Sequence, residues 1–88
     1  MKYSLFFEKQ AAKQLEKLDI VQQKIIVSWI SKNLENNSNP RAIGKPLKGN
    51  LRNYWRYKIG KYRIIAEIND KKVSIFIIEV GHRKDIYK

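Results

Sequence analysis

The segment NYWRYKIGKYRIIAEI, residues 53–68, places Arg56, Lys58 and Arg63 close together, and side chains of these types bind phosphate. Gly60 and the residue after it suit a two-residue hairpin turn, in which glycine accepts the positive φ of the first position. In that register Lys58 faces Arg63, and Arg56 lies one step further out on the same face. Directly opposed like charges cost stability, so we interpret the pair as a site for an external anion. Arginine offers phosphate a planar fork of donors, and lysine offers a compact charge.

The charge balance of the whole chain favours a polyanionic partner. The 88 residues carry a formal net charge of +11, and residues 41–88 hold thirteen Lys or Arg against four Asp or Glu. Residues 41–63 hold eight cations and no acid. Such a segregated field attracts nucleic acid, acidic protein or a membrane surface, in that order. Two simpler readings stay open: the charge only keeps the chain in solution, or long cations splay into water over an exposed sheet.

Length and composition limit the class of protein. Residues 1–88 make one domain with a single modest core, and 43% apolar residues are enough for folding. The absence of cysteine excludes disulfides and thiolate metal sites. The longest apolar runs are far shorter than the roughly 20 residues of a membrane span, and Glu8 and Lys9 interrupt any signal-peptide core. We therefore expect a cytoplasmic protein that contacts no membrane.

The elements that must position the cations follow from the periodicity of apolar residues. KYSLFFE predicts a first strand, EKQAAKQLEKL a short amphipathic helix, and the segment up to about Leu34 a second helix. Asp19 can cap that second helix, with Gln22 reaching back to complete a capping box. From Leu51 the period changes to two, which predicts the hairpin and, after a turn at NDKK, a last strand in VSIFIIEV.

These elements predict an α+β fold with the order β-α-α-β-β-β. Two N-terminal helices should pack on one face of a small twisted antiparallel sheet, and the other face should be partly open and basic. In the hairpin register, the covered face collects Trp55, Tyr57, Ile59, Tyr62, Ile64, Ala66 and Ile68. The second helix should present Ile26, Trp29, Ile30 and Leu34 to that face.

The end of the chain, VGHRKDIYK, completes a pattern that resembles a known family. Gly81 is expected to let the chain bend off the last strand into a polar tail that carries an imidazole and a phenol. With KPLKGNLRNYWRYKIGKYRIIAEI and IFIIEVGHRKDIY, the chain resembles the RelE/ParE toxin superfamily, specifically its RelE-type mRNA-cleaving branch. The match covers essentially the whole chain. Its most specific elements are the leucine-lysine-glycine step, the tyrosine-arginine pair, and the closing glycine, basic residues and tyrosine.

The resemblance implies the toxin of a type II toxin–antitoxin system. Such a toxin is a ribonuclease that uses no metal and no other cofactor, cuts mRNA in the A site of the ribosome, and is silenced by a small antitoxin. By motif position, the implied catalytic residues are Lys58, Arg63, Arg83 and Tyr87. The RNA contacts that we expect around them are Lys48, Arg52, Arg56, Lys61, His82 and Lys84.

Cleavage of RNA through its own 2′-hydroxyl needs a base, positive charge for the phosphorane, and a proton for the departing 5′-oxygen. Neighbouring cations disfavour the ammonium form of Lys58, which makes its neutral form the candidate base. Arg63 would stabilise the phosphate, Arg83 would stabilise or protonate the leaving side, and Tyr87 would stack on a base or align the 2′-hydroxyl. A related branch uses a glutamate where this chain has Lys45, so a carboxylate base of that kind is absent.

Two other functions remain compatible with the same sequence. The ParE-type branch of the superfamily poisons DNA gyrase and shares the fold, so topology does not separate it from the nuclease. A non-catalytic module that binds nucleic acid or the ribosome would also keep the positive face. In either toxin reading, we expect an antitoxin to offer an acidic or amphipathic segment to the basic face or to the sheet edge.

Overall fold

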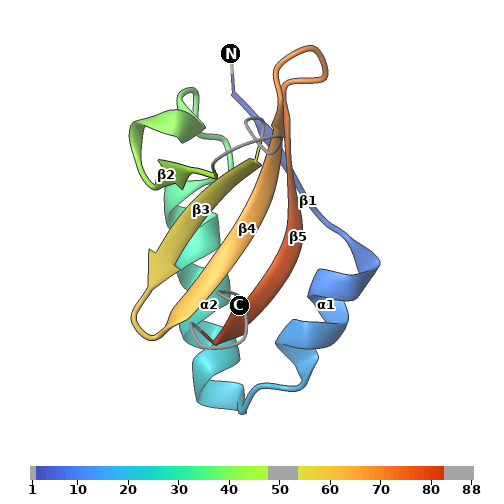
Figure 1. Cartoon of the computed structure of the whole chain (residues 1–88), viewed down its shortest axis with the longest axis vertical. Coiled ribbons are helices and arrows are strands. Elements are labelled where there is room, and N and C mark those ends of the chain that lie inside the picture. Colours follow the sequence, from blue (N-terminus) through green and yellow to red (C-terminus); the bar gives the residue numbers. More distant parts are fainter. Residues whose placement is uncertain (1, 48–53, 83–88) are drawn as a thin grey trace.

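The structure is a computed structural model, and it describes residues 2–47 and 54–82 (Figure 1). Its elements, in chain order, are β1 (Ser4–Phe7), α1 (Lys9–Glu16), α2 (Ile20–Asn33), the 3-10 turn η1 (Pro40–Ala42), β2 (Lys45–Pro46), β3 (Tyr54–Ile59), β4 (Tyr62–Asn69) and β5 (Ser74–His82). The α+β class and the predicted order of helices and strands are confirmed. The two-residue strand β2, inside the segment expected to be a loop, is an addition.

One sheet carries all five strands in the order β1-β5-β4-β3-β2. Neighbours are antiparallel except at one edge, where β1 runs parallel to β5 and Ser4 pairs with Ser74. The sheet is therefore mixed, whereas the sequence predicted antiparallel pairing throughout. Side-chain alternation identifies a strand but carries no information about the direction of its neighbour, which explains the difference.

The Asp19 side chain caps the start of α2 as predicted, whereas the predicted return bond from the Gln22 side chain is not seen. The Asp19 carboxylate accepts a hydrogen bond from the backbone N–H of Gln22 at 2.9 Å. The turn between α1 and α2 is held by Gln23, whose side chain donates to the backbone oxygen of Leu18 at 2.7 Å. These two contacts fix the turn between the helices, and α2 crosses behind β3 and β4 (Figure 1).

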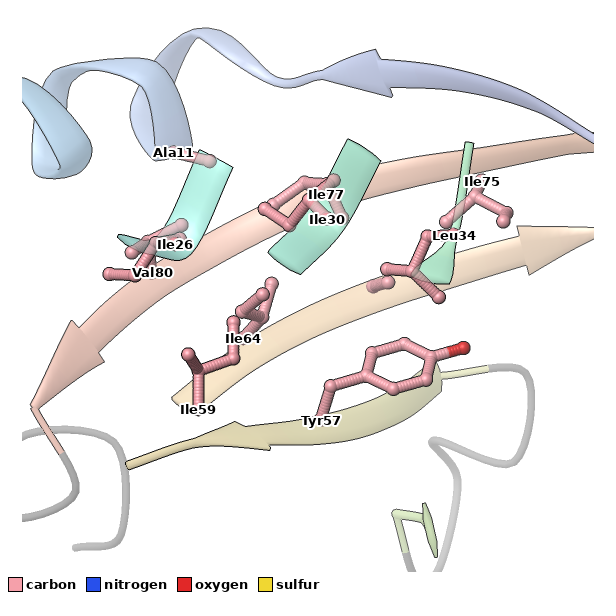
Figure 2. Packing of buried hydrophobic residues seen from close by; sticks show 11 residues of the cluster. Ala11, Ile26, Ile30, Leu34, Tyr57, Ile59, Ile64, Ile75, Ile77 and Val80 are labelled. Atoms are coloured by element: carbon pink, nitrogen blue, oxygen red, sulfur yellow. The ribbon is translucent and has the colours of Figure 1, made fainter. Parts of the chain in front are cut away.

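A single core lies between the helices and one face of the sheet (Figure 2). Its buried members are Ala11, Ile26, Ile30, Leu34, Tyr57, Ile59, Ile64, Ala66, Ile75, Ile77 and Val80. The Tyr57 ring tilts against Trp29 with 5.7 Å between centroids, and its hydroxyl donates to the backbone oxygen of Pro40 at 2.7 Å. This packing confirms the predicted apolar face and fixes β3, so the opposite face of β3 is fixed as well.

A β-bulge in β5 changes which residues face the helices. Ala66 pairs with Ile77 and Ile65 pairs with Glu79, so Ile78 is an extra residue in β5. The extra residue inverts the alternation, and Val80 rather than Glu79 enters the core. The expected bend at Gly81 is wrong, because β5 continues through Gly81 and that residue pairs with Arg63 on β4.

Candidate functional site

The β3–β4 hairpin has the predicted register, which places the cations opposite one another. Lys58 pairs with Arg63, and Ile59 pairs with Tyr62 at the end of the hairpin. Gly60 takes a φ of +60° at the first position of the turn, as the two-residue loop requires. Directly paired residues share a sheet face, and Ile59 faces the core. Lys58 and Arg63 therefore lie on the face away from the helices.

The two members of this pair differ sharply in exposure. Arg63 is only 5% exposed, whereas Lys58 is exposed and Arg56 is partly buried. The Arg63 guanidinium donates a hydrogen bond from Nη1 to the backbone oxygen of Tyr62 at 3.3 Å. Arginine keeps its charge when buried, and lower local polarity strengthens the field of that charge. Arg63 can therefore act as a fixed positive charge below the surface, while Lys58 and Arg56 present accessible donors.

A fourth cation joins the same face through β2. Lys45 pairs with Arg56, and Arg56 lies two residues before Lys58 on β3. We call Lys45, Arg56, Lys58 and Arg63 the basic row. From strand spacing and rise per residue, its ends lie about 12 Å apart. Sequence reasoning did not include Lys45 as a contact, because a two-residue strand has no periodic signal.

A hollow of about 250 Å³ opens beside the basic row, at the edge where β2 meets β3. We call it the edge hollow, and it is lined by Trp29, Gly44, Lys45, Arg56, Tyr57 and Lys58. Gly44 has a φ of +75°, and a Cβ there would lie 2.4 Å from the backbone oxygen of Arg56. Only glycine lets the chain approach β3 this closely, so Gly44 positions the neighbouring Lys45.

Tyr57 supports the site but does not take part in proton transfer. Burial raises the pKa of Tyr57 far above its usual value, which keeps the phenol neutral. Its hydroxyl is committed to the Pro40 carbonyl. The side chain therefore supports β3 from the core side, below the basic row.

A second polar cluster lies at the opposite end of β4, beside the turn to β5. Asp70 accepts hydrogen bonds from Arg41 at 2.8 Å and from the Tyr3 hydroxyl at 2.6 Å. The Arg41 guanidinium is the main reason that the pKa of Asp70 lies below its usual value. The Arg41 guanidinium also lies 6.0 Å from the centre of the Trp55 ring. This cluster joins the N-terminal strand, the η1 segment and the β4–β5 turn, and it is separate from the basic row.

The other predicted contacts divide into three groups. Lys61 is exposed in the hairpin turn, close in sequence to the basic row. His82 lies on the helix side of the sheet, because it pairs with Tyr62 and their rings meet edge to face at 5.5 Å. The remaining predicted residues lie outside the described part of the chain: Lys48, Arg52, Arg83, Lys84 and Tyr87.

Residues 2–47 and 54–82 contain neither a candidate metal site nor a helix able to span a membrane. In these ranges no three His, Cys, Asp or Glu side chains gather in an arrangement able to hold a metal ion. The helices within them are also too short or too polar to cross a bilayer.

Helices on one face of the sheet and a basic row on the other define a small α+β domain with a cationic surface. The family model described as the ParE toxin of a type II toxin–antitoxin system, parDE, matches residues 5–87. Toxin RelG of Mycobacterium tuberculosis (strain ATCC 25618 / H37Rv) is 31% identical over 88 residues, covering all of this chain and 99% of that protein. The chain therefore belongs to the RelE/ParE superfamily of type II toxin–antitoxin toxins, as its motifs predicted.

Solved structures agree with this membership. In the toxin–antitoxin complex RelBE2 from Mycobacterium tuberculosis, one chain matches with a TM-score of 0.83 and 28% identity, over 94% of this chain and 100% of that chain. The isolated RelE toxin of E. coli matches with a TM-score of 0.75 and 27% identity, over 97% of this chain and 90% of that chain. The RelE-like fold is thus shared along nearly the whole sequence.

Proposed function

We propose that this toxin is a ribosome-dependent, metal-independent endoribonuclease that cleaves mRNA in the ribosomal A site and so inhibits translation. The observation that carries the proposal is the Lys58–Arg63 pair on the face away from the helices, with Arg56 beside it. The whole-chain similarity to Toxin RelG and to the RelE toxin of E. coli supports the RelE-type branch.

The basic row suits attack by a ribose 2′-hydroxyl on the adjacent phosphate. In this proposal Lys58 takes the hydroxyl proton, because its side chain is the member of the pair that a substrate can reach. Arg56 contacts the phosphate oxygens, and the fixed charge of Arg63 stabilises the phosphorane from below. Arg83 and Tyr87 keep the roles that the resemblance implies, at the leaving oxygen and at the attacking nucleotide.

The make-up of the described site supports the proposed dependence on the ribosome. The basic row supplies charge, but its accessible members are long flexible side chains that orient a substrate weakly. Orientation of reacting groups accounts for about 7–11 kcal/mol of a barrier in favourable intramolecular cases. In this proposal the ribosome holds the mRNA in the reactive geometry, and the toxin supplies the charge and the base.

A cognate antitoxin is the proposed protein partner, with both proteins in the cytoplasm. The RelBE2 structure from Mycobacterium tuberculosis and the RelBE structure from E. coli are both of toxin–antitoxin complexes. A chain with a net charge of +11 should attract an acidic segment, which would cover the basic row and exclude RNA.

Inhibition of DNA gyrase is the second candidate function, because the matching family model is described as the ParE toxin. A gyrase poison has no need of a phosphate site on the sheet, so the basic row favours the nuclease. A non-catalytic module that binds nucleic acid or the ribosome is the third candidate. It would keep the basic row but would leave mRNA intact.

Primer extension on an mRNA under translation in a purified system tests the proposal. We expect new 5′ ends inside the reading frame when ribosomes and toxin are both present, and intact mRNA when ribosomes are omitted. A parallel supercoiling reaction should show unchanged gyrase activity. Inhibited gyrase with intact mRNA would establish the second candidate, and binding to ribosomes without cleavage would establish the third. Efficient cleavage of free RNA would contradict ribosome dependence.

A further inference from the structure

Trp29 lies between two hollows on adjoining surfaces of the molecule. On one side is the edge hollow beside the basic row. On the other side is an open groove of about 630 Å³ along α2, lined by Lys24, Ile25, Ser28, Trp29, Lys32 and Asn33. Trp29 is partly buried and lines both, so the two hollows adjoin at this residue, and we call them together the path.

The described lining of this path is basic and contains no acid. Lys24 and Lys32 line the groove, and three members of the basic row line the edge hollow. Two other hollows on the described surface contain carboxylates, from Glu67 and Asp70 in one and from Glu79 in the other. Among the described residues, cations thus line the path, whereas carboxylates line part of each of those two hollows.

The groove places charge and apolar surface in parallel rows. Lys24, Ser28 and Lys32 follow one another at four-residue intervals along α2, so they form one row. Ile25 and Trp29 form the adjacent row, and Ile25 is 48% exposed. Single-stranded nucleic acid needs the same two things side by side, namely cations for its phosphates and flat apolar surface for its bases.

We propose that this path is an additional RNA-binding site, which holds single-stranded RNA next to the nucleotide at the basic row. The inference rests on the proposed nuclease function for its ligand. One base stacks on the exposed part of Trp29, and Lys24 and Lys32 contact the phosphates that follow. An acidic protein helix could use the same charges, but three members of the basic row line the adjoining edge hollow, which favours RNA because one strand can contact both hollows.

Salt dependence of RNA binding tests the contribution of the two lysines. The probe is a twelve-nucleotide 2′-O-methyl RNA, which has no free 2′-hydroxyl and cannot be cleaved by the proposed route. For a single strand, each lost phosphate contact lowers the slope of log K against log salt by about 0.7. K24Q/K32Q should therefore lower the slope by about 1.4 and weaken binding about 25-fold at 0.1 M salt.

The matched control removes the same charge from the other helix. Lys9 and Lys13 are exposed on α1 and line neither hollow. K9Q/K13Q should keep the wild-type slope, because those lysines lie off the path. If both double variants lower the slope equally, the effect is one of net charge, and the proposed site is wrong.

Fluorescence tests the stacking contact directly. The chain has two tryptophans, so W55F leaves Trp29 as the only one. Addition of the same RNA should quench its emission, and K24Q/K32Q in the W55F background should shift the quenching to about 25-fold higher RNA concentration. Bound RNA without quenching would overturn the inference. So would a K24Q/K32Q variant that binds RNA normally but loses an acidic helical peptide, which would assign the groove to a protein.

Primer extension distinguishes failure of the proposed RNA-binding site from failure of the proposed nuclease function. Primer extension in the translation system is repeated with wild-type toxin and with K24Q/K32Q. If wild-type toxin leaves translated mRNA intact while K24Q/K32Q still weakens binding of the 2′-O-methyl RNA, the nuclease proposal fails and the binding site stands. If wild-type toxin cleaves and K24Q/K32Q matches it in both cleavage and RNA binding, the binding site fails and the nuclease stands.

Discussion

The close approach of the chain to β3 at Gly44 can be tested by substitution, with Gly60 as the matched control. Both glycines have positive φ, +75° and +60°, a region in which a residue with a Cβ is strained by about 1–3 kcal/mol. Their surroundings differ. A Cβ on Gly44 would lie 2.4 Å from the oxygen of Arg56, whereas a Cβ on Gly60 would meet no atom within 4 Å. Overpacking adds about 1–3 kcal/mol. We therefore expect Gly44→Ala to cost about 2–6 kcal/mol and Gly60→Ala about 1–3 kcal/mol.

Urea unfolding followed by circular dichroism measures the difference. A small domain has about 5–15 kcal/mol of stability in total, so either loss is readily detected. With a denaturant slope of about 1–3 kcal/mol per M, the excess loss in Gly44→Ala should lower the midpoint by about 1 M relative to Gly60→Ala. Equal midpoints for the two variants would show that the chain does not approach β3 closely at Gly44. The positioning of Lys45 opposite Arg56 would then lack its cause.

Three further predictions concern the core, the polar cluster and the basic row. Tyr57→Phe leaves a buried carbonyl without its donor and should cost about 1–3 kcal/mol in the same unfolding assay, and a cost near zero would show that the hydrogen bond is not formed. Arg41 lowers the pKa of Asp70 below its usual value of 3.8. The contribution of Asp70 to folding stability is therefore present above about pH 4 and is lost as the pH falls through the lower pKa of the folded protein. Because Asp70 is 58% exposed, Asp70→Asn should remove an acid-dependent contribution of no more than about 1 kcal/mol, and an unchanged pH profile would contradict the ion pair. Lys58→Met should lower cleavage on ribosomes by about 10²–10⁴-fold, whereas Lys71→Met in the β4–β5 turn should retain it, and equal losses would refute the role of the base.

The hairpin could be predicted from sequence because three local signals agree. Gly60 sets a two-residue turn, the apolar residues alternate on both sides of it, and burial of that set leaves one register. The pairing of Lys58 with Arg63 then follows without any tertiary information. The Asp19 cap was predictable for the same reason, since cap and partner are three residues apart.

Other features depend on contacts that sequence patterns do not encode. The face of Arg63 was predicted, but its burial was not, because alternation along a strand gives the side of a residue and not how deeply it is covered. The pairing of Lys45 requires the close approach at Gly44. The bulge at Ile78 shifts the alternation of side chains in β5 by one residue, and this shift turns His82 to the helix side of the sheet. The polar Glu79 beside the apolar Val80 was the available signal for that shift.

The parallel pairing of β1 with β5 has a consequence for how the chain acquires activity. Ser4 pairs with Ser74, seventy residues later, so the edge strand β1 can join the sheet only after β5 has been made. Such distant contacts form late, because closing a long loop costs entropy before any contact repays it. The sheet of a nascent chain therefore stays incomplete until β5 has been made. A toxin built in this way gains its complete fold, and with it any activity, only after β5 has been made.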